Sequence, residues 1–238
     1  SIFAAARDAG DAPGLIAGER VHTYTQLAEM TKRRLGAISR ELCDGLPCVL
    51  DGTNTLETVV TLYALLEARV PALLVHPQLT ATERADLTAA AARAGRVPHP
   101  DAAAIIFTSG TTGEPRGAVL TRSALLASAS ASTANLGWHG DDRWLLCMPI
   151  ARVGGLSILT RCLAARRCVV LARSFDADRF PEWIATRRIT LVSLVPTMLT
   201  RVFDAHPAWR PPSHLRAALL GGASASTRLL QRAHERGM

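Results

Sequence analysis

Residues 108–117, TSGTTGEPRG, combine four hydroxyl side chains, three glycines and one cation within ten positions. Glycine lets a backbone approach a ligand closely and adopt positive φ, and successive N–H groups in such turns form a concavity that binds anions. Arg116 adds a planar set of donors suited to phosphate oxygens. The segment therefore predicts a phosphate-binding loop, whose expected contacts are Thr108, Ser109, Gly110, Thr111, Thr112, Gly113 and Arg116.

The same loop does not fit the Walker A pattern. It lacks the Gly-Lys-[Ser/Thr] that runs into a helix, and Pro115 intervenes. Apolar residues 105–107 and 118–120 flank it and predict a strand on each side. A hairpin loop chosen only for its turns is the plain alternative, but the density and order of the hydroxyl groups favour anion binding. A ligand is then expected at the carboxyl edge of a sheet.

A second glycine-rich turn lies in AALLGGASAS, residues 217–226. Two adjacent glycines allow the close backbone approach that a flat purine needs. A simple strand-to-helix turn would explain the same pair. After a phosphate loop, the nucleotide interpretation is favoured, and the expected contacts are Gly221, Gly222, Ala223 and Ser224.

Residues 148–163, MPIARVGGLSILTRCL, carry a helical pattern with two faces. Gly154, Ser157 and Arg161 recur at one helical face, while leucines occupy another. If the helix packs on its leucines, Arg161 points elsewhere, into a cavity. Alternatively, Arg161 complements the helix dipole near the C-terminus. The spacing alone leaves both readings open.

The elements that must position these residues alternate along the chain. Apolar runs predict strands over 48–50, 72–75, 103–108, 117–120, 144–148, 168–172, 190–195 and 215–220. Longer periodic segments predict helices over 24–42, 54–69, 80–95, 121–136, from 154, over 176–187, from 197 and over 224–236. Apolar strands separated by helices indicate an α/β fold with largely parallel sheets flanked by helices. We expect two lobes, 1–100 and 101–238, of which the second carries the phosphate loop and is incomplete at its C-terminus.

Composition and charge exclude several classes of protein. The 238 residues are 48% hydrophobic with a net charge of +7, but the basic residues are scattered and not interleaved with aromatics, which argues against nucleic-acid binding. Five cysteines without a C-x-x-C pair indicate neither a disulfide framework nor a zinc site. No apolar run reaches the roughly 18 residues of a membrane span, and no signal segment opens the chain. We expect a cytoplasmic protein.

TSGTTGEPRGAVLT resembles the phosphate-binding signature of the adenylate-forming superfamily, which includes the acyl-CoA synthetases and other AMP-binding enzymes. TYTQLAEMTKRRLGAIS, VSLVPTML and AALLGGASAS are similar to further segments of that family's N-terminal domain. The resemblance implies the fold of that domain, with ATP, Mg²⁺ and coenzyme A as co-substrates and cofactor. It implies catalytic roles for Thr108, Arg116 and Arg152, and acid binding by Gly154, Gly155, Arg161 and Thr197.

The sequence departs from the family pattern at two of these positions. Arg116 stands where the family usually has Lys, and Arg152 where many members have a His that positions the acid. Arg keeps the charge at the first position but changes its reach, and at the second it makes the site more cationic. The chain also ends at Met238, directly after a predicted helix. We therefore expect the N-terminal portion only, truncated before the C-terminal lobe, with no metal ligands of its own.

GGLSILTRCL most resembles the o-succinylbenzoate–CoA ligases of menaquinone biosynthesis, in which the counterpart of Arg161 faces the second carboxylate of the substrate. The resemblance implies acyl-adenylate formation followed by thioester formation with coenzyme A. Another acyl- or aryl-CoA ligase and a truncated, non-catalytic nucleotide-binding domain remain alternatives. A peptide-synthetase adenylation domain is disfavoured, because PIARVGG lacks an Asp to hold an amino group. The expected partners are small molecules, with a homodimer as a candidate assembly.

Overall fold

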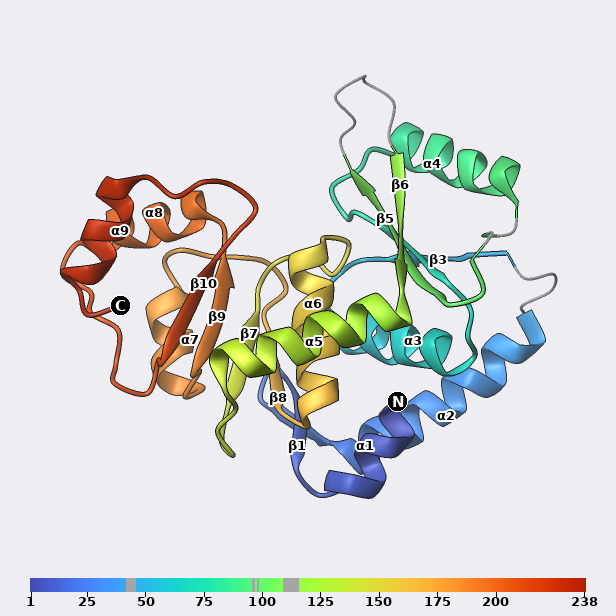
Figure 1. Ribbon diagram of the computed structural model, residues 1–238, viewed down its shortest axis with the longest axis horizontal. Coiled ribbons are helices and arrows are strands. Elements are labelled where there is room, and N and C mark those ends of the chain that lie inside the picture. The colour runs from blue at the N-terminus through green and yellow to red at the C-terminus, as the bar shows by residue number, and fades with distance from the viewer. Residues whose placement is uncertain (42–45, 96, 98, 109–115) are drawn as a thin grey trace.

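The computed structural model describes residues 1–41, 46–95, 97, 99–108 and 116–238, which form two sheets with helices between and outside them (Figure 1). The six-stranded sheet has the order β10-β9-β7-β8-β1-β2, and the four-stranded sheet the order β3-β4-β5-β6. All paired strands are parallel except β1 with β2 and β5 with β6. The strands are β1 (Pro13–Ala17), β2 (Arg20–Thr23), β3 (Cys48–Asp51), β4 (Ala72–Val75), β5 (Ala102–Thr108), β6 (Arg116–Thr121), β7 (Arg143–Leu146), β8 (Cys168–Leu171), β9 (Leu191–Leu194) and β10 (Ala217–Leu220).

The helices divide between the faces of the two sheets. They are α1 (Ile2–Ala9), α2 (Tyr24–Glu41), α3 (Leu56–Glu67), α4 (Ala81–Ala94), α5 (Arg122–Leu136), α6 (Val153–Ala165), α7 (Phe180–Thr186), α8 (Pro196–Ala205) and α9 (Thr227–His234). Buried side chains of α3 and α6 share one apolar core with both sheets. Those of α7, α8 and α9 form a second core on the other face of the six-stranded sheet. The strands are therefore covered on both sides, as their continuous apolar runs require.

Local sequence signals set where several helices begin and end. Thr80 caps α4 through a capping box with Glu83, and Gly95, at φ +70°, ends it. Before α7, the Asp176 carboxylate accepts the N–H groups of Asp178 and Arg179. This side-chain turn competes with helix formation. The helix expected from residue 176 consequently begins only at Phe180.

The sequence analysis is confirmed on the fold class, and each predicted strand and helix has a counterpart within a few residues. It misses α1 and the β1–β2 hairpin, which is too short to show a clear period and turns at Gly18, φ +61°. The division into lobes at 1–100 and 101–238 stays a prediction; each sheet takes strands from both ranges. No described helix has both the length and the apolar character needed to cross a membrane.

Candidate functional site

The order of strands in the six-stranded sheet creates a topological switch point beside β7. The chain passes from β7 through α6 to β8 on one side, and then returns to β9 on the other side of β7. Helix α6 packs in the core between the sheets, whereas α8, which follows β9, packs in the outer core. The connections that leave β7 and β9 therefore run to opposite faces. In open α/β sheets, ligands bind at the carboxyl ends of the strands at such a point (Figure 1).

Two of the predicted ligand segments follow the neighbouring strands β9 and β10. The Gly221 N–H donates to the Leu194 carbonyl at 3.1 Å, which continues the pairing of β10 with β9. Gly222 has φ +78°, and a Cβ at this position would lie 3.1 Å from Val195 Cγ1. Thr197, the second residue of α8, is exposed, as are residues 221–224. The structure thus brings Thr197 and the Gly-Gly turn to the same sheet edge, open to a ligand.

The first turn of α6 packs closely against the segment that follows β7, and this requires glycine at one position. A Cβ at Gly155 would lie 2.3 Å from the Pro149 carbonyl oxygen, so backbone would have to move to admit a side chain there. At Gly154 the nearest atom is Met148 Cε at 2.9 Å, the end of a flexible side chain. Arg152 precedes α6 as its N-cap residue, and its exposed side chain makes no capping hydrogen bond. This turn therefore carries an exposed cation at the sheet edge, beside the positive end of α6.

Asn54, which the sequence analysis did not identify, ties the two sheets together at this edge. Its side-chain amide is buried and donates to the carbonyls of Met148 and Ala172 at 3.0 Å each and of Leu146 at 3.4 Å. The turn after β3 adds a backbone bond, from the Ile150 N–H to the Gly52 carbonyl at 3.1 Å. The carboxyl end of β3 in one sheet is thereby held against the carboxyl ends of β7 and β8 in the other.

His76 is a second residue that the sequence analysis did not identify. It follows β4, and its Nδ1 accepts the Gln78 N–H at 3.2 Å, so Nε2 carries the proton of the neutral ring. Burial, and then the charge of Arg152, lower the pKa of His76 below its usual value. A neutral imidazole therefore accompanies the Arg152 cation at this sheet edge.

Arg161 lies farther along α6 and faces α5. Its guanidinium is half-buried, donates to Ser128 Oγ at 3.4 Å, and lies 5.8 Å from the Trp144 ring centroid. Its Nε is buried and has no partner among the described residues, and burial lowers its pKa. The last carbonyls of α6 accept hydrogen bonds from Arg166 instead. Arg161 therefore has an N–H group available to a ligand, whereas Arg166 is the residue that caps the C-terminal carbonyls of α6.

The predicted phosphate loop begins at the carboxyl end of β5. Thr108 and Arg116 pair across the antiparallel β5–β6 hairpin. Ser109, Gly110, Thr111, Thr112 and Gly113 lie outside the described residues, as does the side chain of Thr108. Their predicted contact with phosphate stays a prediction. The described residues contain no group of three or more His, Cys, Asp or Glu that could hold a metal ion.

Comparisons with known proteins agree with this arrangement. The model of the family described as AMP-binding enzyme matches residues 87–238. A 2-succinylbenzoate–CoA ligase of Bacillus cereus strain Q1 is 43% identical over 138 residues, which are 58% of this chain and 29% of the relative. The chain thus matches less than a third of the length of such curated relatives.

Solved structures show the same fold over the whole chain. An o-succinylbenzoate coenzyme A synthetase from Bacillus subtilis, in complex with ATP and magnesium ion, has a TM-score of 0.88 at 25% identity and covers 100% of this chain and 57% of that one. The N-terminal domain of FACL13 from Mycobacterium tuberculosis, at 18% identity, has a TM-score of 0.86 over 99% of this chain and 72% of that one, a likeness of fold alone. Because the family model matches more than half of the residues of this chain, the chain belongs to the AMP-binding enzyme family.

Proposed function

We propose that this chain forms the nucleotide- and acid-binding part of an AMP-forming acid–CoA ligase, and that its acid is 2-succinylbenzoate. The observation that carries the proposal is the position of Gly222 and Thr197 at the switch point of the six-stranded sheet, in a member of the AMP-binding enzyme family. The name of the 43% identical relatives supports the choice of acid. A solved neighbour in complex with the acyl-adenylate OSB-AMP, at 25% identity, supports the chemistry.

ATP would span the two glycine-rich segments. Thr108, residues 109–113 and Arg116 hold the β- and γ-phosphates, and the turn at residues 221–224 receives adenine. Magnesium prefers oxygen ligands and is commonly bound through substrate phosphates with few protein groups. The described residues offer no cluster of metal ligands. Mg²⁺ would bind through the phosphate oxygens of ATP and would offset their negative charge.

The acid would lie near α6. A dicarboxylate such as 2-succinylbenzoate needs one cation for the carboxylate that does not react, and Arg forms bidentate hydrogen bonds with that group. Arg161 is half-buried and has no carboxylate partner among the described residues. Gly154 and Gly155 keep the turn above it free of side chains. Arg152, with His76 beside it, adds positive charge near the reacting carboxylate.

The reaction has two steps. A carboxylate oxygen attacks the α-phosphorus of ATP, pyrophosphate leaves, and an acyl-adenylate forms. The thiol of coenzyme A then attacks the acyl carbonyl, loses its proton, and AMP leaves. The protein positions the reactants and stabilises the charge that develops at phosphorus, with Arg116 and Arg152 as the cations. A homodimer stays a prediction.

Acid-dependent exchange of pyrophosphate into ATP tests the proposal, with a protein that contains this chain and a panel of 2-succinylbenzoate, benzoate, a fatty acid and amino acids. We expect exchange with 2-succinylbenzoate, and an Arg161→Met variant that raises the KM for this acid without changing that for ATP. Arg228→Met, an exposed arginine on α9, is the matched control. Exchange with the fatty acid or benzoate alone refutes the choice of acid. ATP binding without exchange supports a non-catalytic nucleotide-binding domain instead.

A further inference from the structure

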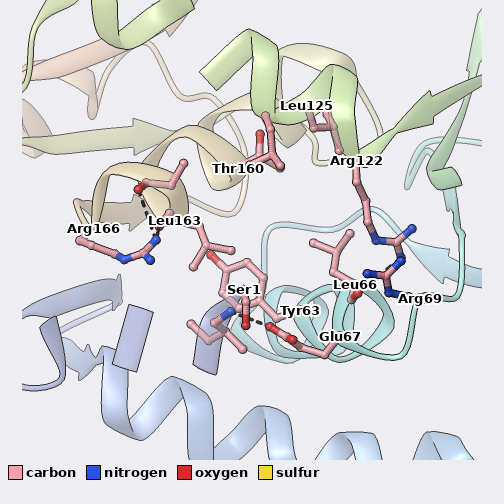
Figure 2. A pocket seen from close by; sticks show the side chains of 13 residues that line it. Ser1, Tyr63, Leu66, Glu67, Arg69, Arg122, Leu125, Thr160, Leu163 and Arg166 are labelled. Atoms are coloured by element: carbon pink, nitrogen blue, oxygen red, sulfur yellow. Dashed lines mark hydrogen bonds between the residues drawn. The ribbon is translucent and has the colours of Figure 1, made fainter. Parts of the chain in front are cut away.

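A cavity of about 480 Å³ lies at the opposite end of the strands from the switch point. It is enclosed by the C-terminal ends of α3 and α6 and the first turns of α5 and α1. Its apolar wall consists of Tyr63, Leu66, Leu125 and Leu163, and Figure 2 shows these side chains with the charged residues around them. A volume of this size is in the range of sites for small molecules.

Two arginines meet at one end of this cavity. The Arg122 guanidinium is partly buried and is held in place by the carbonyls of Ala102 at 2.5 Å and Leu66 at 3.4 Å. Arg69 follows α3 in a left-handed conformation, φ +56°, and Figure 2 shows its guanidinium nitrogens directed toward those of Arg122. In the described part of the chain, no ion pair joins either group to a carboxylate. Two like charges therefore face each other beside an apolar space.

The carboxylates of Asp101 and Glu67 attract the Arg122 guanidinium, whereas Arg69 repels it, and neither carboxylate forms an ion pair with it. The Glu67 carboxylate also lines the cavity, but it accepts the Ile2 N–H at 2.7 Å. Asp101 accepts the Ser123 N–H at 2.9 Å. Arg166, at the far wall, is paired with Asp8. An anion placed between Arg69 and Arg122 would relieve their mutual repulsion and use donors that the chain leaves available.

Tyr63 contributes a hydroxyl group to the wall of the cavity. Its side chain is 3% exposed and lines the cavity, yet its hydroxyl makes no hydrogen bond with any described residue. The oxygen is not among the fully buried, unpaired polar atoms of the described residues, so it is open to the cavity. By contrast, the hydroxyl of Tyr24, equally buried, donates to two backbone carbonyls. A ligand with an oxygen acceptor would satisfy Tyr63.

We propose that this cavity binds a small amphiphilic carboxylate, with its carboxylate between Arg69 and Arg122 and its apolar body against Tyr63 and the leucines. This site is separate from the proposed phosphate site. Arg122 binds the Ala102 carbonyl at the start of β5, whereas the phosphate loop follows Thr108 at the end of that strand. Six residues of extended chain separate the two by roughly 20 Å.

Calorimetric titration with 4-phenylbutyrate, compared with its uncharged isostere 4-phenylbutanamide, tests the proposal. We expect the acid to bind about tenfold more tightly than the amide, because charge-assisted hydrogen bonds add to the shared apolar contact. Arg69→Gln should remove about that tenfold difference, and Tyr63→Phe should weaken binding about threefold. Ala164→Trp, at an exposed position on the wall, should block the cavity.

Arg188→Gln is the matched control, since Arg188 is also exposed and left-handed, φ +49°, after a helix, but lies outside the cavity. It should leave binding unchanged. If Arg161→Met abolishes binding while Arg69→Gln does not, the carboxylate occupies the proposed substrate region and this inference is wrong, although the proposed function stands. Equal affinity for acid and amide also overturns it. Circular dichroism checks that each variant folds. If Ala164→Trp does not fold, Arg69→Gln still tests the proposal, because Arg69 is exposed and its substitution should leave the fold intact.

Discussion

Asn54 is the residue whose substitution most directly tests how the two sheets are joined at the site. Asn54→Ala removes the donors that serve three carbonyls, that of Leu146 at the end of β7 and those of Met148 and Ala172, which follow β7 and β8. The amide has two N–H groups, each worth about 1 kcal/mol net. The carbonyls of Met148 and Ala172 lose this donor in a buried place, which adds roughly 1–2 kcal/mol. The expected loss in the free energy of unfolding is therefore about 3–4 kcal/mol.

For a chain of this length, such a loss lowers Tm by about 6–16 °C. Urea unfolding and calorimetry measure it, and hydrogen exchange locates it. Exchange at the Ile150 N–H, which donates to Gly52, should accelerate more than exchange in β9. Asn135→Ala, an exposed asparagine on α5, is the control and should change stability by less than about 0.5 kcal/mol.

Asn54→Asp adds a pH test of the same bonds. An ionised carboxylate would face three carbonyl oxygens, so burial and repulsion raise its folded pKa. The variant is then least stable relative to the parent above that pKa, and its deficit shrinks as the pH falls from 7 toward 5, because the protonated carboxyl can donate. A loss below about 1 kcal/mol for Asn54→Ala, or a pH-independent deficit for Asn54→Asp, would refute the reasoning.

Three further predictions concern stability and ligand binding. Gly155→Ala should lower the free energy of unfolding by about 1–3 kcal/mol because its Cβ meets backbone, whereas Gly154→Ala meets only a flexible methyl group and should lower it less; urea unfolding compares them, and equal losses contradict the prediction. Gly222→Ala should cost about 1–2 kcal/mol from its positive φ and weaken ATP binding in calorimetry, while Gly221→Ala, with open space at Cβ, should do neither. Asp142→Ala should destabilise by about 3–5 kcal/mol, since it leaves the Arg216 guanidinium without its ion-pair partner. Burial opposes ionisation of Asp142, but hydrogen bonds from Arg216, the His139 N–H and Thr190 outweigh it and lower the pKa of Asp142. The contribution of Asp142 to the free energy of unfolding is therefore fully present above the unfolded pKa near 3.8 and is lost as the pH falls through the lower folded pKa. Acid unfolding of the parent and of Asp142→Ala should show this as stability curves that converge at low pH.

Local signals predict much of the fold correctly. The box between Thr80 and Glu83 begins α4, and Gly95 ends it, because these interactions join residues three or four apart. Apolar runs predict the strands because covered parallel strands are apolar on both faces. Gly155, in the first turn of α6, and Gly222, after β10, stand where the backbone favours glycine. Such features depend on short stretches of sequence, and a sequence displays them directly.

Which residues come together at the candidate site depended on tertiary structure. Asn54 reaches carbonyls 92 to 118 residues away, and Tyr63 lines one cavity with arginines from three helix ends. Nothing in the residues around Asn54 or His76 separates them from an ordinary helix cap or strand end. The sequence by itself determined which segments are strands, helices and glycine turns, because neighbouring residues decide those. Only the folded chain decided which polar groups face each other, because parallel strands that are remote in sequence bring their ends to one edge.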